Sequence, residues 1–457
     1  MDRGREKKRL IRLSGLAPCL SHTAEALDGL RAKDADEKIL KAALADARET
    51  LASVFRALLS DLATDGTVRE RVIRILTCTG WVGAAYPYAP GKVTGKDVVE
   101  ALCGEEQAVR TKTEEGGSRG LPKATREARR RAAEGVALLG SVDEAQRFLS
   151  DVGGMAAGRE TERRIALEAG RRTMEASRAG TLEARPHAEW TPPEGARPVT
   201  PTLVASVDGK GFGCAKADLK GRRGKGGGAA RTRNANVICL KWYRYKDARG
   251  EPLFEPRTGR YHVTGAGGEA LGEETYALAE QEGLLTAPRL EYITDGETEL
   301  DCVYRDFFAR NLPTKVKVVR VQDSMHSCDY VDAVVKALEK DEAKAGKRSH
   351  ELRRRLVNAG WEGFLKSFRR VFGEGAEARL SGDDRKAWDY LWKRREQMDY
   401  GRYRKRCLVI GSGMVESACK LLIGSRLTGP GMRWRFRNGL CIASLRAALR
   451  SRRKIAA

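Results

Sequence analysis

Three acidic residues stand where carboxylates from distant parts of the chain could meet. Asp208 follows an apolar run in VASVDGKG, and Asp295 follows another in EYITDGE. Glu416, in IGSGMVESACK, is the single acidic residue among fourteen lysines and arginines between positions 400 and 457. Carboxylates that converge from separate elements can hold two Mg²⁺ ions, with Mn²⁺ as a substitute, for phosphodiester chemistry. We predict all three as catalytic residues and metal ligands.

Each carboxylate also has a plain structural explanation. Asp-Gly pairs are ordinary turn formers, so Asp208 or Asp295 taken singly is more often a turn residue than a ligand. Glu416 could form an exposed ion pair with Lys420. The joint placement of two aspartates at strand ends favours the metal site. A helix that starts near Ser412 would put Glu416 in its first turn, where the helix dipole favours the ionised form.

A second pair of candidates follows a later apolar run. Asp323 and His326 are three positions apart in VQDSMH, so they could share one helical face and orient each other or a nearby ligand. A structural role for His326 at the start of a helix is the alternative. We predict both as accessory residues of the site.

The apolar periodicity shows which elements must position these residues. Strand patterns precede Asp208, cover residues 236–245 and 260–264, and return at 290–294 and 316–321; helical patterns cover 269–285 and 299–311. Three strands, helix, strand, helix, strand is the order of an RNase H-like fold. We predict an α/β protein with a mixed five-stranded sheet, in which Asp208 ends the first strand at a turn and Asp295 ends the fourth.

The segments before the core are predicted to be mainly helical. Residues 1–120 include an amphipathic stretch at 35–62, which packs within its own domain or mediates dimerisation. Residues 121–184 are basic and predict a helix-turn-helix. Its first helix is opened by a capping box of Ser141 and Glu144, and its buried face would hold Ala145, Phe148, Leu149 and Val152.

A GlyGly turn at 153–154 leads to the second helix of this motif, and three of its basic side chains are predicted to contact DNA in a major groove: Arg159, Arg163 and Arg164. An ordinary helical hairpin with a solvated basic face fits the same pattern. Residues 185–201 hold five of the fourteen prolines and predict a semi-rigid linker.

Charge over the whole chain favours a polyanionic partner, because lysine and arginine exceed aspartate and glutamate by 85 to 62, a formal charge of +23. A generic basic surface is the alternative. No apolar run approaches the roughly 18 residues of a membrane helix, and the N-terminus lacks a signal-peptide core. We therefore expect a cytoplasmic, nucleoid-associated protein with no membrane partner.

Two further segments are basic. The Gly-rich stretch 221–228 lacks the spacing of a phosphate-binding loop and predicts a flexible basic loop between the first two strands. In residues 433–437, arginines alternate with Trp434 and Phe436, so an extended chain would present arginines to phosphates while the aromatic rings enter the core. The DNA-binding residues predicted in the C-terminal region are Arg426, Arg433 and Arg435.

Together these motifs resemble those of bacterial insertion-sequence transposases of the Kra group, which are related to the Mutator-like and hAT-like transposases. The resemblance covers roughly residues 130–455 and rests on SVDGKG, ITDGE, VQDSMH, IGSGMVESACK and RLTGPGMRW. It implies a DDE transposase, which cuts and joins DNA strands at the ends of an insertion sequence, with Asp208, Asp295 and Glu416 as its triad. Asp323 is the other candidate for the second aspartate; Asp295 is preferred because it ends the fourth strand.

The resemblance also implies a divided catalytic core, with parts at 202–330 and 406–457 separated by a helical insertion at 331–405. Its partners would be terminal inverted repeats and target DNA, both double-stranded, bound by a homodimer or larger assembly without a small-molecule cofactor. A metal-dependent nuclease or resolvase without strand transfer is one alternative. A degenerate transposase that only binds DNA is another.

Overall fold

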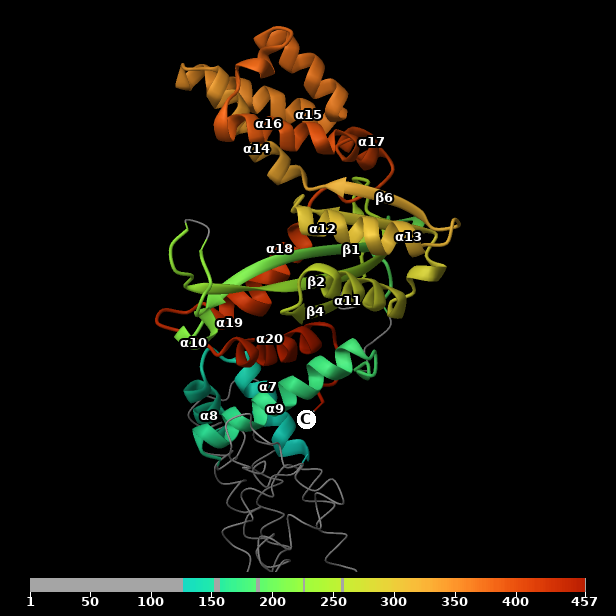
Figure 1. Cartoon of the computed structure of the whole chain (residues 1–457). Coiled ribbons are helices and arrows are strands. Elements are labelled where there is room, and N and C mark those ends of the chain that lie inside the picture. The colour runs from blue at the N-terminus through green and yellow to red at the C-terminus, as the bar shows by residue number, and fades with distance from the viewer. Residues whose placement is uncertain (1–125, 152–156, 186–189, 225–226, 256–258, 457) are drawn as a thin grey trace, which may run out of the picture. The chain divides into compact units, whose positions relative to one another are not determined.

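The computed structural model describes residues 126–151, 157–185, 190–224, 227–255 and 259–456 (Figure 1). The chain forms two compact units, one ending at Ala169 and the other spanning Gly170–Ala456. The predicted N-terminal helical region, its stretch at 35–62 and the GlyGly turn at 153–154 lie outside the described residues. No helix in the described ranges is long and apolar enough to cross a membrane.

A mixed sheet lies at the centre of the second unit, in the order β3-β2-β1-β5-β6, with β4 also paired to β2. Strands β1 (Arg197–Gly213) and β2 (Thr232–Lys246) form a long antiparallel hairpin. β5 (Arg289–Thr294) runs parallel to β1, and β6 (Lys317–Gln322) runs parallel to β5. The α/β class and the mixed sheet are thus confirmed.

Two shorter strands complete the sheet by pairing antiparallel with β2. They are β3 (Pro252–Phe254) and β4 (Arg260–Thr264). The sequence predicted β4, but β3 was missed because three residues are too few to show an alternating pattern.

Alternation along β1 sends its side chains into two separate cores. Leu203, Ala205 and Val207 pack with α11 (Gly268–Gln281) and α12 (Thr298–Val303). Val204 lies on the opposite face, in a core shared with the helices that follow β6. Because the period of a strand is two, Asp208 lies on the Val204 face.

A helical segment follows β6, and Figure 1 shows it as a bundle beyond that edge of the sheet. It consists of α14 (Ser324–Leu338), α15 (Glu342–Phe372), α16 (Gly382–Arg394) and α17 (Tyr400–Lys405). Its core is aromatic and contains Trp361, Phe364, Phe368 and Trp388, all buried. These four rings hold the helices of the insertion together.

The chain then returns to the sheet. α18 (Gly413–Cys419) lies against β1 and β2. A π-helical turn and α19 (Ser425–Leu427) follow, and α20 (Phe436–Arg450) packs beside β4. The last part of the sequence therefore belongs to the same unit as the first strand.

Two expectations about β1 were wrong. The strand does not end at Asp208 but continues to Gly213, which pairs with Thr232 of β2. The apolar pattern stops at Asp208, yet main-chain pairing needs no apolar side chains. β1 also begins at Arg197, inside the predicted linker, and a register shift between Pro198 and Thr202 accommodates the prolines there.

The basic helical region contains α7 (Arg126–Leu138), α8 (Val142–Asp151) and α9 (Arg159–Arg178). Half of the capping box is present: the Glu144 amide donates to Ser141 Oγ at 3.0 Å, whereas the Glu144 carboxylate accepts from the Gly140 amide and not from that of Ser141. The expected burial of Phe148 was wrong, since this ring is 50% exposed.

The candidate recognition arginines are partly engaged within the protein. Arg159 forms an ion pair with Asp143 at 3.2 Å, and Arg163 forms one with Glu160 at 2.7 Å. Arg164 is half-buried. Contact with DNA would therefore require the first two side chains to exchange one partner for another.

We predict that Phe368→Ala lowers the free energy of unfolding of the helical insertion by about 3–5 kcal/mol, because it leaves a cavity beside Trp388, whose ring centroid is 4.7 Å away. Urea denaturation followed by tryptophan fluorescence measures the change. Phe372→Ala, at the half-buried end of the same helix, is the control and should cost clearly less. Equal losses for the two variants would contradict the packing described.

Candidate active site

Strand pairing brings three aspartates to one edge of the sheet. β1 and β5 pair in parallel as far as Ser206 and Ile293, and Asp208 and Asp295 each lie two residues farther on. β5 and β6 pair up to the residues directly before Asp295 and Asp323. Because parallel strands in register keep equivalent positions at the same level, the three aspartates follow one another across β1, β5 and β6.

Helix α18 adds Glu416 to this edge, in its first turn as predicted. Oε1 of Glu416 accepts a hydrogen bond from the Ser412 hydroxyl at 2.7 Å. Among the described residues, no ion pair joins Glu416 to Lys420. One turn later, the Cys419 thiol donates to the main-chain oxygen of Asp208 at 3.7 Å, which fastens the helix to β1.

Asp323 is the most completely hydrogen-bonded carboxylate of the site, and its side chain is only 1% exposed. Oδ1 accepts from the main-chain N–H of His326 at 2.7 Å and from the ring Nδ1 of His326 at 3.0 Å. Oδ2 accepts from the Ser412 amide at 2.5 Å. Asp323 thus caps α14 and also holds the residue that precedes α18.

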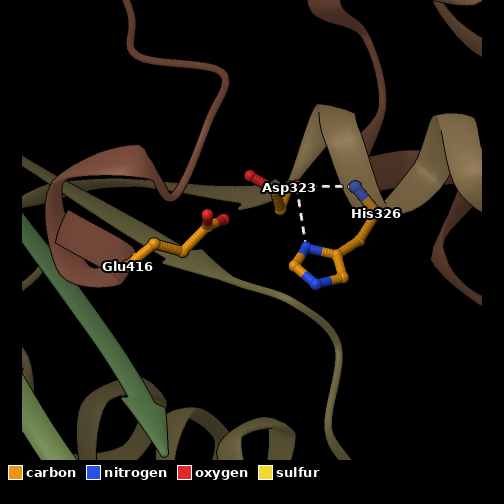
Figure 2. Close-up of side chains that lie close together, drawn as sticks. All are labelled: Asp323, His326 and Glu416. Atoms are coloured by element: carbon orange, nitrogen blue, oxygen red, sulfur yellow. Dashed lines mark hydrogen bonds and ion pairs between the residues drawn. The ribbon is translucent and has the colours of Figure 1, made fainter. Parts of the chain in front are cut away.

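Figure 2 shows the carboxylate of Glu416 directed toward Asp323 and His326. One potential ligand atom from each of these three residues lies within 4.8 Å of the other two. Among the described residues, this is the group of side chains that could hold a metal ion. It contains one member of the predicted triad and both predicted accessory residues.

Electrostatic coupling links Asp208 and Asp295 to the same group. Burial raises the pKa of Asp208, and the negative charges of Asp295 and Glu416 raise it further. The hydrogen bond to Asp323 raises the pKa of His326 to about 9, with Asp295 and Glu416 acting in the same direction. All five predicted site residues therefore share one neighbourhood.

The pKa of Asp323 is shifted in the opposite direction to that of Asp208. Burial alone would raise the pKa of Asp323, but the hydrogen bonds from His326 and Ser412 outweigh it and hold the pKa below its ordinary value. At neutral pH the pair is consequently an ionised carboxylate beside an imidazolium.

The donor set suits a hard divalent cation such as Mg²⁺, which prefers carboxylate oxygens. Oδ1 of Asp208 accepts one hydrogen bond, from the Gly209 amide at 2.7 Å. Oδ1 of Asp295 likewise accepts from the Glu297 amide at 3.0 Å. A carboxylate has about four acceptor sites, so each of these keeps the capacity to bind a cation.

Helix α16 supports the Asp295 turn from outside the sheet, which the sequence did not reveal. The Tyr390 hydroxyl donates to the main-chain oxygen of Asp295, and Arg394 donates to that of Gly296. Arg394 also donates to Asp301 at 2.9 Å. Gly296 has φ of 86° and is buried, and a side chain there would collide with Tyr390 and Arg394. Neither Tyr390 nor Arg394 carries a local sequence signal for this role.

The arginines predicted to bind DNA in the C-terminal region divide into two kinds. Arg426 is only 2% exposed, and its guanidinium lies 5.2 Å from the centroid of the Trp434 ring. It therefore packs inside the protein rather than on the surface that phosphate contact requires. Arg433 and Arg435 are exposed, and Phe436 is buried as expected.

Comparison with known proteins gives no relative, since no family model, no curated protein and no solved structure matches the chain. Function must therefore be inferred from the residues and their geometry. That geometry gathers four carboxylates and one histidine from elements far apart in the sequence.

We predict that His326 titrates near pH 9 in protein kept metal-free with a chelator, and that Asp323→Asn moves its pKa toward the ordinary 6.5. Because the folded pKa is raised, the pair stabilises the fold below about pH 6.5, and this contribution disappears as pH rises through the folded value. NMR of the imidazole signals measures both. Glu416→Gln, which removes a more distant charge, should lower the pKa of His326 less than Asp323→Asn does. An unchanged pKa of His326 in Asp323→Asn would contradict the hydrogen bond between Asp323 and His326.

We predict that Arg394→Ala accelerates amide hydrogen exchange in residues 296–303 by roughly ten- to hundredfold, because a hydrogen bond to a charged group contributes about 1.5–3 kcal/mol. Hydrogen-exchange mass spectrometry provides the measurement. Arg395→Ala is the matched control, since the neighbouring Arg395 donates to the main-chain oxygen of Trp392 instead. Faster exchange in both variants would show that α16 is merely destabilised.

Proposed function

We propose that this protein is a DDE transposase with an RNase H-like core, which cuts DNA and joins DNA strands. The observation that carries the proposal is the convergence of Asp208, Asp295 and Glu416 on one edge of the sheet from β1, β5 and α18. The strand order also supports it, since the antiparallel strands β1 to β4 precede β5 and β6, which run parallel to β1.

In this proposal Asp208, Asp295 and Glu416 are the ligands of two Mg²⁺ ions. Bound there, the ions would activate a water or 3′-hydroxyl and stabilise the leaving oxygen. Burial and, to a smaller extent, repulsion from Asp295 and Glu416 raise the pKa of Asp208. A divalent cation would relieve this repulsion, which favours cation binding at this edge. The carboxylates would bind and orient the two ions, and no covalent intermediate with the protein is needed.

Asp295 fits the second ligand position better than Asp323 does. Both oxygens of Asp323 already accept hydrogen bonds that hold α14 and α18 in place, whereas Asp295 accepts on one oxygen only among the described residues. We therefore assign Asp323 to positioning. His326, charged at neutral pH, keeps Nε2 as a donor toward a DNA phosphate.

The DNA partners in this proposal are the terminal inverted repeats of the element and its target DNA. Assembly on DNA as a dimer or larger complex would follow from the need to hold two ends. The excess of 85 basic over 62 acidic residues favours such a partner.

The decisive experiment is cleavage and joining of duplex DNA carrying the flanking terminal repeats, with Mg²⁺. We expect Asp208→Asn, Asp295→Asn and Glu416→Gln each to lower the rate by more than about a thousandfold. Binding in Ca²⁺ should persist. The control Glu362→Gln changes an exposed carboxylate of α15 and should cut normally.

Each alternative predicts a different result in this assay. Cleavage without joined products would identify a nuclease or resolvase. Binding without cleavage by the wild type would identify a degenerate transposase. Normal cleavage by Asp295→Asn, with loss in a folded Asp323→Asn variant, would transfer the ligand role to Asp323.

A further inference from the structure

The β1–β2 hairpin extends well beyond the carboxylates and is strongly basic. Between Gly209 and Ala235 the sequence has eight lysines and arginines and one acidic residue, Asp218. The hairpin carries a short helix, α10 (Lys216–Leu219), and its outer arms pair again where Arg223 bridges Ala229. Figure 1 shows it projecting past the end of the sheet.

The base of the hairpin is held by the segment that precedes α20. The Trp434 amide donates to Gly213 at 2.9 Å, and the Ala215 amide donates to Trp434 at 2.8 Å. The rings of Phe212 and Phe436 stack with centroids 5.5 Å apart. Hairpin and C-terminal segment thus form one structural piece.

The one acidic residue of the hairpin is used in this attachment. Asp218 is half-buried, and its carboxylate accepts from the Phe436 amide at 3.3 Å. In contrast, six basic side chains on the same piece are exposed and form no ion pair with any described residue. They are Lys216, Lys220, Arg222, Arg223, Arg231 and Arg433. We call these six residues the basic hairpin platform.

We propose that the basic hairpin platform binds the phosphate backbone of double-stranded DNA beside the cleavage site. The inference rests on the proposed function for the position of the reacting phosphate, while the binding itself requires no catalysis. Unpaired lysines and arginines favour phosphate through counterion release, and an acidic neighbour that would compete for them is absent from the exposed part of the described hairpin.

The spacing suits a duplex. Cys214 lies six positions beyond Asp208, where the antiparallel arms of β1 and β2 have ended. At roughly 3.3 Å per residue this point is about 20 Å from Asp208, and the platform begins just beyond it. One turn of duplex is about 34–36 Å long. A duplex with a phosphate at Asp208 would therefore reach the platform within one turn.

The test measures binding of a 30-base-pair duplex to the full chain by fluorescence anisotropy in Ca²⁺, across about 50–200 mM KCl. The variant Arg222→Gln/Arg223→Gln removes two phosphate contacts. Each contributes about 0.9 to the slope of log affinity against log salt, so the slope should fall by about 1.8. Over a fourfold rise in salt, the variant should lose roughly twelvefold less affinity than the wild type.

The matched control is Arg354→Gln/Arg355→Gln, two exposed arginines of α15, which changes the net charge equally. Its salt slope should stay that of the wild type, and thermal unfolding should show both variants folded. A wild-type slope in the hairpin variant, or an equal fall in the control, would overturn the proposal. Platform binding by a protein that never cuts DNA would support this inference and refute the proposed function.

Discussion

A single buried carboxylate fixes the geometry of the whole site. Asp323 is excluded from water, so its charge is tolerated only if both oxygens are hydrogen-bonded. The donors come from His326, at the start of α14, and from Ser412, 89 positions away and next to α18. One electrostatic requirement therefore sets where two helices begin, and with them the position of Glu416.

The helical insertion is consequently part of the site and not an appendage to it. The insertion leaves the sheet at Asp323 and returns at Ser412, so the two ends meet at one hydrogen-bonded residue. From its middle, Tyr390 and Arg394 reach back to the turn that carries Asp295. The large aromatic core holds these two side chains in fixed positions, because close-packed protein interiors have low compressibility.

Local sequence patterns were sufficient to predict strands β1, β2, β4, β5 and β6 and the first-turn placement of Glu416. They failed where long-range pairing decides the outcome: β1 continues beyond Asp208 because β2 pairs with it, and Arg426 is buried although its sequence context is basic. The roles of Asp323, Tyr390 and Arg394 depend on hydrogen bonds between residues 89 to 98 positions apart. No local pattern encodes such partners.

The wide separation of the carboxylates has a consequence for protein synthesis. α18 fastens to β1 through residues 211 positions apart, so Asp208 leaves the ribosome long before Glu416 exists. During that interval the sheet can form, but two parts of the site are still missing. They are Glu416 and the segment before α20 that holds the base of the hairpin. The carboxylate cluster is therefore complete only after the segment that carries Glu416 has been synthesised.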